Sequence, residues 1–101
     1  MFPKFIIVGI PGTGMGALRM GVVPNHRDLL DGCERAYGGG WYEIDRGNRT
    51  LNLYGSSGDF GEPQFNHLCR IPSEFRGWTL TYATDIGAKS REIDLTDAEW
   101  F

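Results

Sequence analysis

The chain contains two histidines, and His26 stands in a context that suggests chemistry. Asn25 precedes it as a good helix N-cap, and Asp28 follows where an acidic side chain suits the first turn. Because the start of a helix disfavours a positive charge, we expect the imidazole to stay neutral and basic. A neutral imidazole can act as a base toward water or as a nucleophile toward phosphorus. The alternative is a surface histidine that only belongs to a helix cap.

A glycine-rich loop supplies the second part of such a site. Gly55, Gly58 and Gly61 are regularly spaced and allow the backbone to adopt positive φ angles. Consecutive N–H groups can then turn inward and bind phosphate oxygens without a cationic side chain. Lys4, at the start of an aliphatic strand, would add a point charge for the same phosphate. An ordinary turn and a solvated lysine are the alternatives.

Another glycine motif, Gly12–Ala17, satisfies the dinucleotide-binding pattern G-x-G-x-x-G/A. That pattern requires a long helix whose N-terminus faces a pyrophosphate. Only Ala17–Met20 has room to be helical before Gly21 and Pro24 intervene. We therefore interpret the glycine-rich stretch Gly9–Gly21 as a flexible surface loop.

The hydrophobic pattern predicts the elements that must position these groups. Phe5–Ile10 is a continuous apolar run, typical of a strand covered on both faces. Apolar side chains at helical spacing predict a helix from Asn25 to about Tyr37, and a second short helix is expected over 64–71. Further strands are predicted at 39–45 and 49–54, which form a hairpin, and at 78–83.

This order of elements indicates an α/β fold, a sandwich with a mixed sheet and two main helices. At 101 residues the chain is long enough for one domain and too short for two, so 1–101 is expected to be a single domain. We expect residues 84–101 to be an acidic C-terminal extension. Thr96–Glu99 resembles a capping box for one terminal turn.

Composition narrows the possible partners. The formal net charge is −3, so no overall positive field attracts a nucleic acid polymer. Cys33 and Cys69 belong to no metal-ligand cluster, and reduced thiols are expected. The apolar run near the start of the chain is short, which predicts a strand in place of a signal peptide or a membrane span. We therefore expect a cytoplasmic protein that binds no membrane.

Several of these segments, taken together and in order, resemble the Janus/Ocnus phosphohistidine phosphatases. The shared features are Lys4 at the start of an aliphatic strand, His26 at the start of the first helix, and Cys33 before the glycines of 38–40. The loop Tyr54–Gly61 matches the Tyr-Gly loop that precedes the second helix in that family. The resemblance extends from about Lys4 to Asp85.

The resemblance implies a metal-independent hydrolase with no cofactor. It makes His26 the general base or phospho-accepting group of a protein-histidine phosphatase. It assigns phosphate binding to Ser57, Gly58 and Asp59, mainly through backbone N–H groups, with Lys4 as a supporting cation. The substrate would be a phosphohistidine-containing protein or a small phosphorylated ligand.

Two residues depart from the family pattern. Trp41 stands where the family commonly has a basic residue, and Asp59 places a carboxylate in the phosphate loop, where it would repel the anion if it faced it. The first alternative is therefore a non-catalytic phosphate- or nucleotide-binding module, in which Trp41 stacks on a base and Asp59 accepts a hydrogen bond. The second is an interaction protein that contacts its partner through the tail from Thr84.

Overall fold

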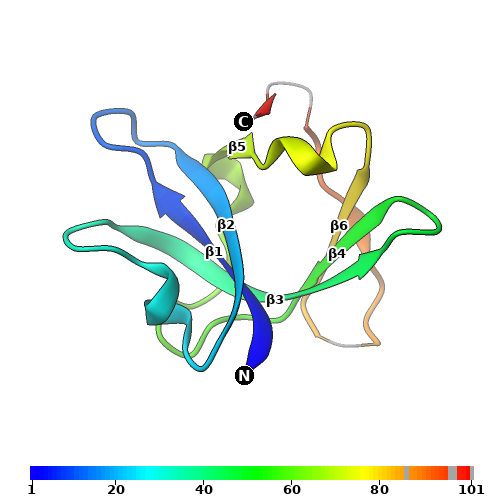
Figure 1. The fold of residues 1–101 in the computed structure, drawn as a ribbon, viewed down its shortest axis with the longest axis horizontal. Helices are drawn as coiled ribbons and strands as arrows, with labels where there is room; N and C mark the ends of the chain where they lie inside the picture. Colours follow the sequence, from blue (N-terminus) through cyan, green and yellow to red (C-terminus); the bar gives the residue numbers. More distant parts are fainter. Residues whose placement is uncertain (86, 96–97, 101) are drawn as a thin grey trace.

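The computed structural model describes residues 1–85, 87–95 and 98–100. Eight β-strands form one mixed sheet in the order β7-β6-β4-β3-β1-β2-β5-β8. The sheet curls, so that its two ends face each other across an open side (Figure 1). The strands are β1 (Phe2–Gly9), β2 (Gly16–Val23), β3 (Ala36–Asp45), β4 (Thr50–Tyr54), β5 (Leu68–Ile71), β6 (Thr79–Ala83), β7 (Arg91–Glu92) and β8 (Glu99–Trp100).

The expected α/β sandwich with two main helices is wrong. The described residues form an all-β structure whose helical elements are three short 3-10 turns: η1 (His26–Leu29), η2 (Phe65–His67) and η3 (Ser73–Phe75). The first expected helix is reduced to η1, because Gly32 takes a φ of 53° and β3 begins soon afterwards. The second is divided between η2 and β5. In both segments strand pairing overrides a helical spacing, which is a weak preference by itself.

Strand β2 occupies residues that were expected to be a loop. Gly12 and Gly14 have φ angles of 78° and 69°, and they turn the chain back along β1. β2 then pairs antiparallel with β1 and parallel with β5, where Gly16 lies beside Leu68. The pairing with β2 explains why the end of the second predicted helix is extended.

All four predicted strands are confirmed. β1 is central and buried on both faces. β3 and β4 form the predicted hairpin, in register from Trp41 and Tyr54 to Asp45 and Thr50. β6 lies parallel to β4. The terminal turn predicted at Thr96–Glu99 lies partly outside the described residues, and Glu99 belongs to β8.

The two faces of the sheet are buried in different ways. The inner face carries the main hydrophobic core, built from Phe5, Leu18, Leu51, Leu53, Ile71, Phe75 and Leu80. On the outer face, a second cluster of Ile6, Val8, Ala17 and Leu29 lies over β1 and β2.

We divide the outer face into two halves. The covered half consists of Lys4, Ile6, Val8, Ala17 and Gly39, over which residues 24–35 and Phe60 pack. The bare half lies over β3 from Trp41 onward and over β4 and β6. Its outward side chains are Trp41, Glu43, Asp45, Thr50, Asn52, Tyr54, Thr79, Thr81 and Ala83.

Two further findings concern the cysteines and membranes. Cys33 and Cys69 are free thiols, the first exposed and the second half-buried. Among the described residues, no helix has the length and apolar character needed to cross a membrane.

Candidate functional site

The structure brings three of the predicted site residues together. Lys4, His26 and Ser57 are only 6%, 4% and 4% exposed, and all three lie around Gly39–Trp41 of β3. Lys4 is the β1 residue beside Trp41, the ring of His26 lies over Gly39, and the Ser57 N–H donates to the Gly39 carbonyl at 2.9 Å. Sequence reasoning therefore found residues that are neighbours in space, although it expected them in a different fold.

His26 is held firmly in this cluster. Its Nε2 lies 2.7 Å from the carbonyl oxygen of Gly40, so Nε2 carries the hydrogen and donates it. Its ring meets Trp41 edge to face, with centroids 5.0 Å apart. Because η1 has only four residues, it is too short for the helix dipole that was expected to keep the ring neutral. The predicted cap is real, since the Asn25 N–H donates to the Asp28 carboxylate at 2.9 Å.

The ammonium group of Lys4 already has partners within the fold. Its Nζ donates to the Val23 carbonyl at 2.9 Å and lies 5.1 Å from the centroid of the Phe2 ring, a cation–π contact. The salt bridges of the described residues involve Arg19 and Arg70, and Lys4 takes no part in them. The lysine therefore fixes the end of β2 beside β1.

The predicted phosphate loop closes on itself. Ser57 and Gly61 form an isolated β-bridge, and the Ser57 hydroxyl accepts hydrogen bonds from the N–H groups of Asp59 and Phe60, both at 3.1 Å. These N–H groups are thus directed at the serine oxygen of their own loop. Gly58 and Asp59 are exposed at its tip, and no residue lies within 4 Å of the position that a Gly58 side chain would take.

A cavity of about 570 Å³ lies on the open side of the curled sheet, and we call it the seam cavity. Its volume lies in the range of small-molecule sites. Phe65 and Tyr82 form an aromatic wall, with ring centroids 4.8 Å apart. One end of the sheet contributes Leu68 and Cys69, and the other contributes Tyr82, Arg91 and Glu92, with further walls from Met15, Phe65, Asn66, Ile93, Asp94 and Ala98.

Polar groups surround the mouth of the seam cavity. Arg91 is exposed and is the strand partner of Tyr82, so its side chain lies on the inner face of the sheet, as that of Tyr82 does. The Tyr82 hydroxyl donates to the Gly55 carbonyl at 3.0 Å. Burial raises the pKa of the Tyr82 phenol, and the charges of Glu62 and Asp85 raise it further, so the phenol stays neutral and hydrogen-bonded.

Sequence reasoning missed the seam cavity. Tyr82 was expected only on a strand, and Phe65 was expected on a short helix. The sequence does indicate that Leu80 and Tyr82, two residues apart on one strand, face the same side, and in the structure this is the inner face. What the sequence could not show is that the sheet curls without closing at this point, since that depends on pairing between distant strands.

The structure gives no support for a dinucleotide site at Gly12–Ala17 or for a metal site among the described residues. Gly12–Ala17 forms a hairpin turn and the start of β2, so no helix is present to receive a pyrophosphate. Within residues 1–85, 87–95 and 98–100, no group of His, Cys, Asp and Glu side chains is arranged to hold a metal ion.

We compared the chain with protein-family models, with curated proteins and with solved structures, and found no match in any of the three. The site must therefore be interpreted from its own geometry.

Proposed function

We propose that this protein is a non-catalytic binding module that takes a small ligand in the seam cavity. The seam cavity itself is the observation that carries the proposal: it is an opening of about 570 Å³ with an aromatic wall and a polar mouth. Open cavities with apolar walls and a few polar groups are the usual form of ligand sites. By contrast, the imidazole, the ammonium and the loop amides of the predicted catalytic cluster already have partners inside the fold.

The walls indicate the kind of ligand. Phe65 and Tyr82 offer ring faces to a flat, apolar body, and Leu68 and Ile93 extend the apolar surface. Arg91 lies on the same face of the sheet as Tyr82 and offers a positive charge to an acidic substituent, whereas Glu92, the strand partner of Thr81, has its side chain on the outer face. The favoured ligand class is therefore an aromatic or fused-ring compound with one acidic group.

The test uses 8-anilinonaphthalene-1-sulfonate, a planar probe with one sulfonate. We expect saturable fluorescence enhancement in the native protein, and about tenfold weaker binding for Cys69→Trp, whose ring would fill the cavity. Cys33→Trp is the matched control, because Cys33 is exposed and outside the cavity. Near-ultraviolet circular dichroism should show that each variant keeps its packing. Equal probe binding by both variants would contradict the proposal.

A second candidate function is the hydrolysis of phosphohistidine or a related phosphoramidate. The gathering of Lys4, His26 and Ser57 around one segment of β3 favours it. Substrate would reach the His26 ring only after the packing around it opens, because the residue is 4% exposed. With either function we retain the cytosolic location that the sequence predicts.

This second candidate has a direct test. The protein, His26→Ala and the control His67→Ala are incubated with a phosphohistidine peptide in EDTA, and phosphate release is followed. Release by the protein and by His67→Ala, with none from His26→Ala, would support hydrolysis through His26. No release by the folded native protein would remove this candidate.

A further inference from the structure

The bare half of the outer face is organised in rows that run across three strands. Directly paired residues in neighbouring strands have their side chains on the same face. The aromatic row is Trp41, Tyr54 and Ala83. The polar row is Glu43, Asn52 and Thr81. Because the rows are two residues apart along each strand, they are separated by about 7 Å.

The aromatic row is held in a fixed orientation. The Trp41 and Tyr54 rings are stacked, with centroids 6.5 Å apart and planes inclined by 24°, and both side chains are half-buried. The edge-to-face contact with His26 supports Trp41 from one side. Gly55 leaves room for the indole, because a β-carbon there would lie 2.8 Å from Trp41 Cε3.

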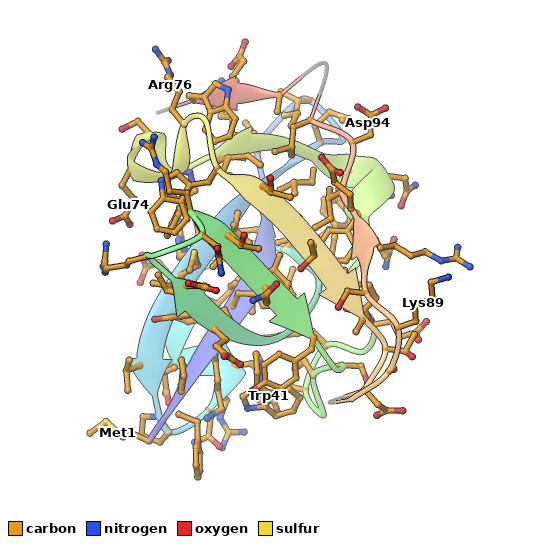
Figure 2. The ribbon with its side chains drawn as sticks, turned by 90° about the vertical axis from the view of Figure 1, so that its right-hand side faces the viewer. Met1, Trp41, Glu74, Arg76, Lys89 and Asp94 are labelled. Atoms are coloured by element: carbon orange, nitrogen blue, oxygen red, sulfur yellow. The ribbon has the colours of Figure 1, made fainter. Side chains whose placement is uncertain are left out.

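A hollow of about 310 Å³ lies beside this row. Ala83 gives it space, since its methyl group is the smallest side chain that the row contains. The side chains that matter for recognition are Glu43, Asn52, Tyr54, Asp85 and Ser90, which all line the hollow. Figure 2 shows Trp41 at the opposite end of the molecule from Arg76.

The polar groups of the hollow include both donors and acceptors. Asn52 Oδ1 accepts a hydrogen bond from Thr81 Oγ1 at 2.6 Å, which leaves the two N–H donors of the amide for another partner. Glu43 lies directly opposite Asn52, and Glu43 and Asp85 are exposed acceptors. The Ser90 hydroxyl can donate or accept a hydrogen bond.

This combination disfavours anionic ligands. A phosphate would meet the carboxylates of Glu43 and Asp85, and none of the described residues that line the hollow is basic. An ammonium group would be attracted to these carboxylates, but it would leave the two N–H donors of Asn52 without an acceptor. A neutral ligand that is rich in hydroxyl groups can satisfy both kinds of group, because each hydroxyl donates and accepts.

We infer that the bare half is a binding site for a neutral pyranose sugar. The apolar C–H face of the ring lies against Tyr54 and Trp41, and the hydroxyls reach the polar row. The separation of the rows suits this, since a pyranose with its substituents spans a similar distance. The inference is independent of the proposed function, because the seam cavity is on the inner face of the sheet.

The test titrates the native protein with cellotetraose and with maltotetraose, followed by tryptophan fluorescence and calorimetry. We expect a Kd of about 1 mM or lower for at least one of them. Tyr54→Ala should weaken binding about tenfold, and Asn52→Ala about fivefold, through lost stacking and lost hydrogen bonds. The matched controls are Tyr37→Ala and Asn48→Ala, which change the same residue types outside both the hollow and the seam cavity.

A further variant tests the inference without changing the packing of the aromatic row. Glu43 is exposed, so Glu43→Gln should keep the fold and still lower sugar affinity. The inference is overturned if neither sugar binds the folded protein at about 10 mM. It is equally overturned if binding survives both Tyr54→Ala and Asn52→Ala in variants with native circular dichroism.

Discussion

One strand, β3, passes through both halves of the outer face, and the two halves use it differently. In the covered half it contributes the glycines of 38–40, over which His26 and the loop of Ser57 pack closely. In the bare half it contributes large side chains, beginning with Trp41, that remain partly exposed. The change from glycine to large side chains marks the point where the sheet passes from packed to open.

Polar side chains also have different roles in the covered half and in the bare half. In the covered half, the polar groups of Lys4, His26 and Ser57 bind backbone groups and hold loops against the sheet. In the bare half, Asn52 is oriented by Thr81 and keeps its donors for another partner. The buried polar groups of the covered half therefore anchor loops, and the partly exposed Asn52 beside the aromatic row belongs to the site that we infer for a sugar.

The largest expected effect is on the apolar floor of the covered half. Ile6 is fully buried, and Ile6→Ala should lower the free energy of unfolding by about 4 kcal/mol through lost burial and a new cavity. Thr81→Ala in the bare half should cost about 1 kcal/mol, the value of its hydrogen bond. Urea denaturation measures both. Equal losses would mean that the two halves do not differ in packing.

A smaller effect is expected from the glycines. A methyl group at Gly39 would meet the Phe5 carbonyl and lie 3.3 Å from the His26 ring, so Gly39→Ala should cost about 2 kcal/mol. Gly58→Ala is the control, because nothing lies within 4 Å of its position and little change is expected. Thermal unfolding compares the two. An unchanged melting temperature for Gly39→Ala would show that His26 is not packed closely on β3.

The smallest expected effect is the change in folding stability with pH. Glu34 is bound by Arg19, which also donates to the Leu29 carbonyl at 2.9 Å and so holds residues 24–35 to β2. The hydrogen bond from Arg19 lowers the pKa of Glu34 below its ordinary 4.5. A lowered pKa gives stability that is present above 4.5 and is lost as pH falls through the lowered value.

Glu34→Gln should therefore be less stable than the native protein at neutral pH, and the difference should disappear in acid. Asp45→Asn is the matched change in the bare half, where hydrogen bonds from Asn48 lower the pKa of Asp45 within a single turn. Amide exchange of residues 24–35 should rise in Glu34→Gln and stay unchanged in Asp45→Asn. A stability difference that persists at low pH would show that the ion pair is not its source.

The sequence predicted the strands that carry a strong local pattern. The run Phe5–Val8 and the hairpin around Arg46–Asn48 depend on neighbouring residues, and both were found. The helix expected after Asn25 failed because Leu29 and Leu30 pack onto the covered half from a turn, and the spacing of apolar residues is the same in either case. β2 was hidden by its flanking glycines, which form a hairpin turn at 12–14.

The candidate site was predicted in part. Lys4, His26 and Ser57 were named together and lie together, but the sequence did not reveal that all three are buried. Both cavities were missed because each is lined by segments distant in the chain. Such sites follow from the curl and register of the whole sheet, and no short motif encodes them.

The two ends of the sheet have a consequence for self-association. Exposed edge strands are templates on which other chains can add and aggregate. Here each outermost strand, β7 and β8, has two residues within the part of the chain that the structure describes. A foreign strand would find few backbone groups in line, and Arg91 and Glu92 would bring charges to the contact. The shortness of the edge strands thus disfavours edge-to-edge pairing with other chains, even though the sheet is open along one side.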